Sequence, residues 1–117
     1  MKKHRYKELK IWQKSMDLVE EIYTITKSLP SQEDFNLKPQ LNRCAVSIPS
    51  NIAEGSGRDS NKSFIHFLNI SISSAFELET QLFLIHRLYD IEINEVQEKV
   101  EEIQKMIRSF SISLNKI

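Results

Sequence analysis

Apolar residues recur along most of the chain at alternating steps of three and four, which is the spacing of one face of an α-helix. The pattern predicts four helices, over about residues 9–29, 36–54, 60–89 and 94–114. The third helix carries the seam typical of bundle cores, in Phe64, Leu68, Ser71, Ala75, Leu78, Leu82, Ile85 and Tyr89. The fourth repeats it in Val96, Val100, Ile103, Ile107, Phe110 and Leu114.

Residues with strong end preferences mark the limits of these helices. Asn36 and Ser60 are predicted N-caps, Gly55 is predicted to end the second helix, and Asn94 with Gln97 is predicted to form a capping box. The connections are short, so each helix must run back along the one before it. We therefore predict an all-α, antiparallel, up-down-up-down four-helix bundle that forms a single domain over residues 1–117.

Three helices carry more apolar residues than one core face needs. The first has two rows, Trp12, Met16, Val19, Tyr23 and Thr26 beside Ile11, Leu18, Ile22, Ile25 and Leu29. The second adds Val46, Pro49 and Ala53, and the third adds Ile65, Ile72, Phe76 and Phe83. On a monomer this last row would leave a large exposed patch, which favours self-association as a cyclic homo-oligomer. The alternative is a wide core stripe within one bundle.

Charge is balanced overall but unevenly distributed. Sixteen basic and sixteen acidic residues give a net charge of zero, which argues against a dedicated nucleic-acid binder. Residues 1–14, however, hold six cations and one acid, a net of +5, whereas residues 77–102 hold two cations and eight acids, a net of −6. The nucleic-acid-binding candidates are Lys2, Lys3, Arg5, Lys7, Lys10 and Lys14, with Arg43, Arg58 and Lys62 as second candidates. The alternative for the N-terminal cluster is a solvated tail.

No pattern of catalytic or metal-binding residues is present. Carboxylate-bridged metal bundles need Glu-x-x-His, which does not occur, and the three histidines are never three or four residues apart. Cys44 lies on or beside the core face of the second helix, where a cysteine usually acts as a small hydrophobe. We expect no enzyme activity, no catalytic residues, no metal and no cofactor.

The same residues bear on where the protein acts. A single cysteine allows no internal disulfide and favours a reducing compartment. The basic N-terminus has no apolar run behind it, and no apolar segment is long enough to cross a membrane. We expect a cytoplasmic protein with no membrane partner.

The turn from Gly55 to Ser60 is the most phosphate-like feature. Its glycines allow close approach to the backbone, the third helix begins there with free N–H groups, and Arg58 and Lys62 add charge. No P-loop follows, so the alternative is a tight turn between two helices.

Three blocks of sequence carry a family resemblance: "QLNRCAVSIPSNIAEGSGRDS" over residues 40–60, "ELETQL" over 77–82 and "LKIWQKSMDLVEEIY" over 9–23. They resemble the bacterial four-helix-bundle proteins that are encoded in intervening sequences of 23S rRNA genes. The resemblance runs from about Leu9 to Leu114. It implies a homopentamer, and kinship with the basic accessory protein of diversity-generating retroelements, which binds a reverse transcriptase and RNA.

Two functions follow as hypotheses, because the task of the family is unsettled and no catalytic residues carry over from it. One is a non-enzymatic oligomer that associates with RNA, in which several copies multiply the basic cluster. The other is a protein-binding scaffold or accessory subunit that docks another protein, such as a polymerase.

Overall fold

The computed structural model describes residues 4–116, and these residues form helices and no strand. Four long helices follow one another: α1 (Lys10–Lys27), α2 (Leu37–Ser56), α3 (Asn61–Tyr89) and α4 (Asn94–Asn115). Two single 3-10 turns precede the first pair, η1 (Tyr6–Glu8) before α1 and η2 (Ser31–Glu33) before α2. The number and order of the predicted helices are confirmed. The first helix ends two residues earlier than predicted, and the second continues two residues further.

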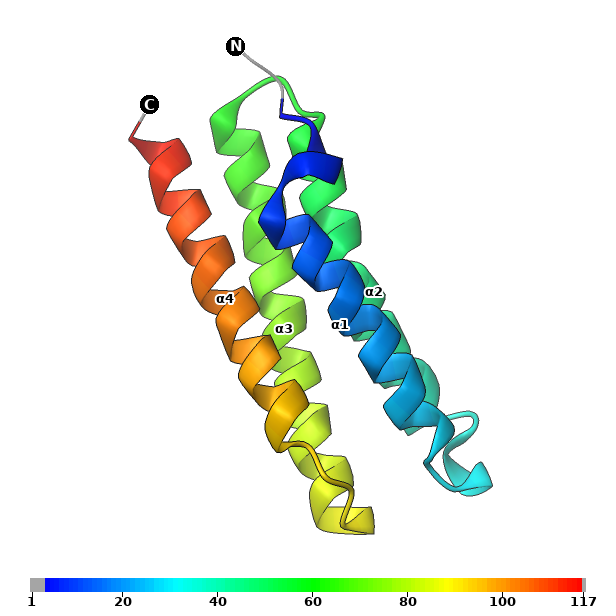
Figure 1. Cartoon of the computed structure of the whole chain (residues 1–117). Coiled ribbons are helices and arrows are strands. Elements are labelled where there is room, and N and C mark those ends of the chain that lie inside the picture. The colour runs from blue at the N-terminus through cyan, green and yellow to red at the C-terminus, as the bar shows by residue number, and fades with distance from the viewer. Residues whose placement is uncertain (1–3, 117) are drawn as a thin grey trace.

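Each helix packs against its neighbours in the chain, and α4 also packs against α1, which closes the bundle (Figure 1). The molecule measures 48 × 23 × 20 Å. The α1–α2 and α3–α4 connections lie together at one end, here called the loop end (Figure 1). The α2–α3 turn lies at the opposite end, together with η1 and the last turns of α4 (Figure 1). We call this second end the terminal end.

The core follows the predicted seams. In α3, every seam residue from Phe64 to Ile85 is buried, and in α4 the buried positions include Val100 and Ile107. In α1 the two apolar rows separate, because Ile11, Leu18 and Ile22 are buried whereas Met16 and Tyr23 are each 41% exposed. One side of α1 therefore faces the core and the other presents apolar groups at the surface.

The helix caps agree only in part with the predictions. Ser60 caps α3 as predicted, because its hydroxyl accepts a hydrogen bond from the Ser63 N–H at 3.1 Å. The capping box at Asn94 is wrong: Ile93 precedes α4 without a side-chain cap, and Gln97 is buried. Gly55 does not end α2 but lies buried inside it.

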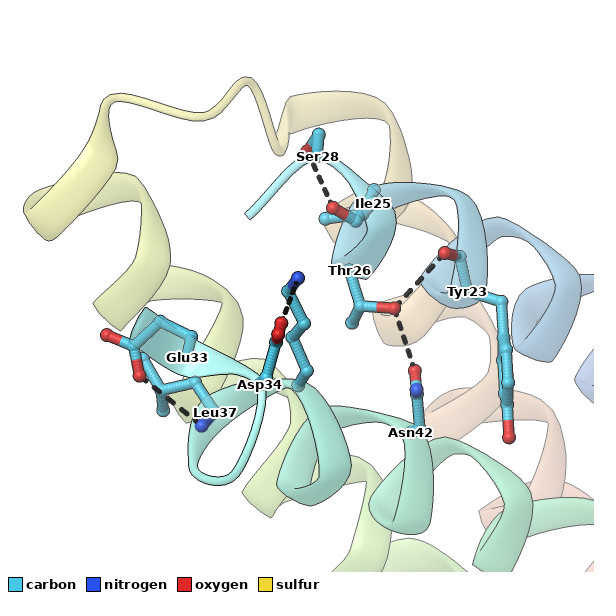
Figure 2. A network of polar contacts seen from close by, with 9 residues as sticks. Tyr23, Ile25, Thr26, Ser28, Glu33, Asp34, Leu37 and Asn42 are labelled. Atoms are coloured by element: carbon cyan, nitrogen blue, oxygen red, sulfur yellow. Dashed lines mark hydrogen bonds and ion pairs between the residues drawn. The ribbon is translucent and has the colours of Figure 1, made fainter. Parts of the chain in front are cut away.

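Asn36 precedes α2 but provides no side-chain cap. Instead the buried carboxylate of Glu33 accepts from the Leu37 N–H at 3.4 Å, as Figure 2 shows. The other oxygen of Glu33 accepts a hydrogen bond from the Tyr89 hydroxyl at the end of α3. Nearby, the Thr26 hydroxyl lies 3.0 Å from the side-chain oxygen of Asn42, which links α1 to α2 (Figure 2). These contacts fix the α1–α2 connection to the bundle.

Candidate nucleic-acid interface

The turn η1 brings the N-terminal basic residues back onto the bundle. The Gln13 side-chain amide donates to the Lys7 carbonyl at 2.9 Å, and the rings of Tyr6 and Trp12 meet edge to face with their centroids 5.3 Å apart. Both contacts hold η1 against α1. The turn η1 also lies against the end of α2, and the hollow between them is lined by His4, Arg5, Tyr6, Lys7, Glu8, Ala53, Ser56 and Gly57. Arg5 and Lys7 therefore lie beside the α2–α3 turn, from which they are separated by some 50 residues of sequence.

The N-terminal candidates differ in how free their charges are. Lys2 and Lys3 lie outside the described residues. Arg5 is exposed and forms a loose ion pair with Glu8, at 3.6 Å. Lys14 is paired with Glu102 of α4, so its charge is partly neutralised. Lys7 and Lys10 are exposed and form no ion pair with any described residue.

The second candidates do not all join this cluster. Arg58 lies in the α2–α3 turn, 2.6 Å from a Glu54 oxygen and with its guanidinium 4.5 Å from the centre of the Phe67 ring. Lys62 lies exposed in the first turn of α3 beside it. Arg43 is twelve residues before Gly55 on the same helix, about 18 Å along the axis, and is not part of the terminal end.

Three exposed cations that the sequence analysis did not single out complete this surface: Lys105 and Arg108 on the last turns of α4, and Lys116 directly after the helix. Lys105 lines a groove with Lys10 of α1, and the Asn61 amide donates to the Leu114 carbonyl at 3.3 Å, which joins the end of α4 to the start of α3. The sequence does contain a signal for this basic segment, since residues 105–116 include these three cations and no acid. The up-down-up-down topology that the sequence predicts would place that stretch at the same end of the bundle as residues 4–14.

The fold thus separates charge along its length. Residues 4–14, 54–62 and 105–116, which make up the terminal end, hold nine cations and three acids, a net of +6. The remaining described residues hold five cations and thirteen acids, a net of −8. A chain with no net charge therefore presents a positive end, and such a concentration of one sign attracts polyanions.

The four apolar residues predicted to form a subunit contact differ in how exposed their side chains are. Ile72 is only 7% exposed and belongs to the core, and Ile65 is partly buried against it. Phe76 and Phe83 are about half exposed, at 47% and 50%. Only these last two present a substantial apolar surface to a partner.

Cys44 and His4, two side chains of types that act in catalysis in other proteins, both contact neighbouring residues of the bundle. Cys44 is buried with its Sγ 3.5 Å from a Glu77 oxygen, and burial, followed by this neighbouring carboxylate, raises the pKa of the thiol. The His4 ring packs edge to face against Phe64 and Phe110. Within residues 4–116, no three histidine, cysteine, aspartate or glutamate side chains are grouped so that they could hold a metal ion. No helix in that range is long and apolar enough to cross a membrane.

Comparison with known proteins places this fold. The chain matches the family described as 23S rRNA-intervening sequence protein over residues 7–109. A crystal structure of a protein of unknown function from Bacteroides thetaiotaomicron, assigned to the S23 ribosomal protein family, is similar with a TM-score of 0.79 and 28% sequence identity. The match covers 86% of this chain and 97% of that one. No curated protein matches. With its four packed helices and a match over most of its length, the chain belongs to the family of 23S rRNA-intervening sequence proteins.

Proposed function

We propose that this chain is a non-enzymatic, RNA-associated protein of the cytoplasm, in which antiparallel four-helix bundles assemble into a homo-oligomer that binds RNA at the terminal ends of its subunits. The observation that carries the proposal is the convergence of three basic segments at one end. The turn η1, the α2–α3 turn and the last turns of α4 together give that end a net charge of +6.

The physical basis is the release of counterions. Each phosphate that a cation contacts releases ions condensed on the nucleic acid, so binding strengthens as salt is lowered. Surface ion pairs such as Arg5 with Glu8 contribute little stability, so these cations can exchange a carboxylate for a phosphate at small cost. An oligomer repeats the surface, and several linked contacts bind far more tightly than one.

The test is a fluorescence-anisotropy titration of the purified protein against a structured RNA, repeated from low to physiological salt. We expect saturable binding that weakens steeply with salt. The substitutions Lys7→Gln and Arg108→Gln should each reduce the slope of log K against log salt by about one. Lys27→Gln, at the loop end, is the matched control and should leave the slope unchanged. If the protein does not bind at low salt, the RNA proposal is rejected.

A second candidate function, a scaffold that docks another protein, has its own supporting observation at the loop end. Phe35, in the α1–α2 connection, is 99% exposed, and Leu88 near the end of α3 is 56% exposed. Exposed large apolar groups of this kind are typical of protein-binding surfaces. A protein that co-purifies with the wild type and is lost with Phe35→Ser, while RNA binding is absent, would favour this function.

A further inference from the structure

Two hollows lie next to each other on the surface, one beneath η1 and one between α1 and α2. The first is the hollow beneath η1 described above, and the second is lined by Tyr6, Trp12, Met16, Val19, Val46, Pro49, Ser50 and Ala53. Both are lined by Tyr6 and Ala53, so they lie next to each other. We call the whole the α1–α2 groove, and the part beneath η1 its mouth.

The chemistry of the walls changes along this groove. The mouth carries the cations of Arg5 and Lys7, with Glu8 as its one acid. Beyond Tyr6 none of the lining residues among residues 4–116 is charged, and within that range Ser50 contributes the only hydroxyl other than that of Tyr6. A ligand that matched both parts would be anionic at one end and apolar or flat at the other.

The apolar part is open and holds two aromatic rings. Met16 and Val46, on opposite walls, are about 40% exposed. Tyr6 and Trp12 are both half-buried and meet edge to face at an interplanar angle of 66°, so neither ring lies flat on the other. From Val46 to Ala53 the wall runs two helical turns, about 10 Å, which is room for about three stacked bases at about 3.4 Å each.

We propose that the α1–α2 groove binds unpaired nucleotides of RNA, with their phosphates at Arg5 and Lys7 and their bases stacked on Tyr6 and Trp12. The proposal rests on the RNA association proposed above and specifies the class of RNA. Bases in a duplex are stacked on each other and cannot enter a groove, whereas unpaired bases stack on aromatic side chains. A purely apolar ligand, such as the face of a helix, would offer no negative charge to Lys7, which forms no ion pair with any described residue.

The chain has a built-in reporter, because Trp12 is its only tryptophan. Titration with a ten-nucleotide oligoadenylate should quench the Trp12 fluorescence, with a midpoint that matches the binding curve measured by anisotropy of a labelled copy. A ten-base-pair RNA duplex should bind the basic end with little change in this fluorescence. If oligoadenylate binds but the fluorescence does not change, the groove is not its site and the proposal is overturned, although the RNA association stands.

A substitution within the groove makes the test independent of fluorescence. Val46→Glu places a carboxylate on a half-exposed wall position, so the fold should be kept, which far-UV circular dichroism verifies. Oligoadenylate binding should weaken at least tenfold, while duplex binding changes less than threefold. Leu84→Glu is the matched control, since it makes the same change of charge at a position of α3 that is 40% exposed and lies outside the terminal end, and it should weaken oligoadenylate binding less than threefold.

Three other outcomes would overturn the proposal in distinguishable ways. Equal losses for oligoadenylate and duplex would mean that Val46→Glu acts only through overall charge. A second copy of the chain could instead fill the groove. In that case the Trp12 fluorescence would change with protein concentration in the absence of RNA, and Val46→Glu would dissociate the oligomer. No anisotropy change with either RNA would reject the RNA association itself.

Discussion

At the scale of single residues, Gly55 shows how closely two helices approach. A Cβ at this position would lie 2.7 Å from Cδ1 of Phe64 and 2.9 Å from Cβ of Phe67, both on α3. It would also lie 3.2 Å from the Phe64 carbonyl oxygen, which cannot move without the helix. Gly55 lies in the last turn of α2 and is therefore required by close packing against α3, and not by a left-handed backbone conformation at a helix end.

Gly55→Ala should accordingly destabilise the bundle although alanine favours helix. Overpacking of this kind costs about 1–3 kcal/mol, and we expect a loss in that range in urea unfolding followed by circular dichroism. Gly57→Ala is the control, because a Cβ there meets only the Glu54 carbonyl oxygen, at 3.8 Å. It should change stability by less than about 0.5 kcal/mol. Equal effects of the two substitutions would contradict the packing role of Gly55.

Cys44 makes the stability of the folded protein depend on pH. Its pKa in the folded protein is raised above the ordinary 9.0, chiefly by burial and then by the hydrogen bond with Glu77. The unfolded chain therefore loses the thiol proton first as pH rises, and the folded state binds more protons in that range. The stabilisation of the folded state is complete well below pH 9 and decreases as pH rises through and above that value.

We expect Cys44→Ser to reduce this alkaline loss of stability, because serine does not titrate and its hydroxyl can still donate to Glu77. The measurement is the free energy of unfolding in urea at pH 7.5 and at pH 10, for the wild type and the variant. Other groups also titrate in this range, so the quantity of interest is the difference between the two proteins. An identical decrease in both would show that the thiol does not contribute.

At the scale of elements, the structure assigns different roles to residues of the same type. Ser60 and Asn94 both stand at a helix start with side chains that commonly cap helices, and only Ser60 does so. At α4 the carboxylate of Glu92 accepts from the Asn94 backbone N–H at 2.8 Å. At α2 the carboxylate of Glu33 accepts a hydrogen bond from the Leu37 backbone N–H in the same way. Acidic side chains from the preceding connection therefore satisfy N–H groups at two of the helix starts.

Ser60→Ala should cost about 1 kcal/mol of stability, the usual value for the loss of a helix N-cap. Asn94→Ala should change stability by less than about 0.5 kcal/mol, because its side chain caps nothing. Thermal unfolding followed by circular dichroism measures both. A larger loss of stability for Asn94→Ala than for Ser60→Ala would contradict this and support the capping box that the sequence predicted.

At the scale of the whole molecule, two exposed phenylalanines on α3 test the proposed oligomer. Phe83→Glu should shift the protein to smaller species in sedimentation velocity while its circular dichroism stays native, because Phe83 is half exposed in the single chain. Ile72→Glu should instead unfold the protein, since a charge at a position that is 7% exposed is buried without a partner. An unchanged sedimentation coefficient for Phe83→Glu would remove that face from the subunit contact.

The sequence was sufficient for the helices and their core faces, because helical periodicity is a local property that a core must satisfy on every turn. The buried seam of α3 was predictable for this reason, and so was the cap at Ser60. Family membership also followed from the sequence, since the block around Pro49 is long and specific.

The tertiary structure alone decided which of two apolar rows is buried and which charges meet. Trp12 and Val46 lie on different helices, and only the packing of α1 on α2 makes them walls of one groove. Lys10 and Lys105 are 95 residues apart and line one hollow, because the bundle returns α4 to the level of η1. Local sequence determines the face of each helix, whereas the neighbours of that face depend on long-range packing, and both candidate surfaces of this protein are made of such neighbours.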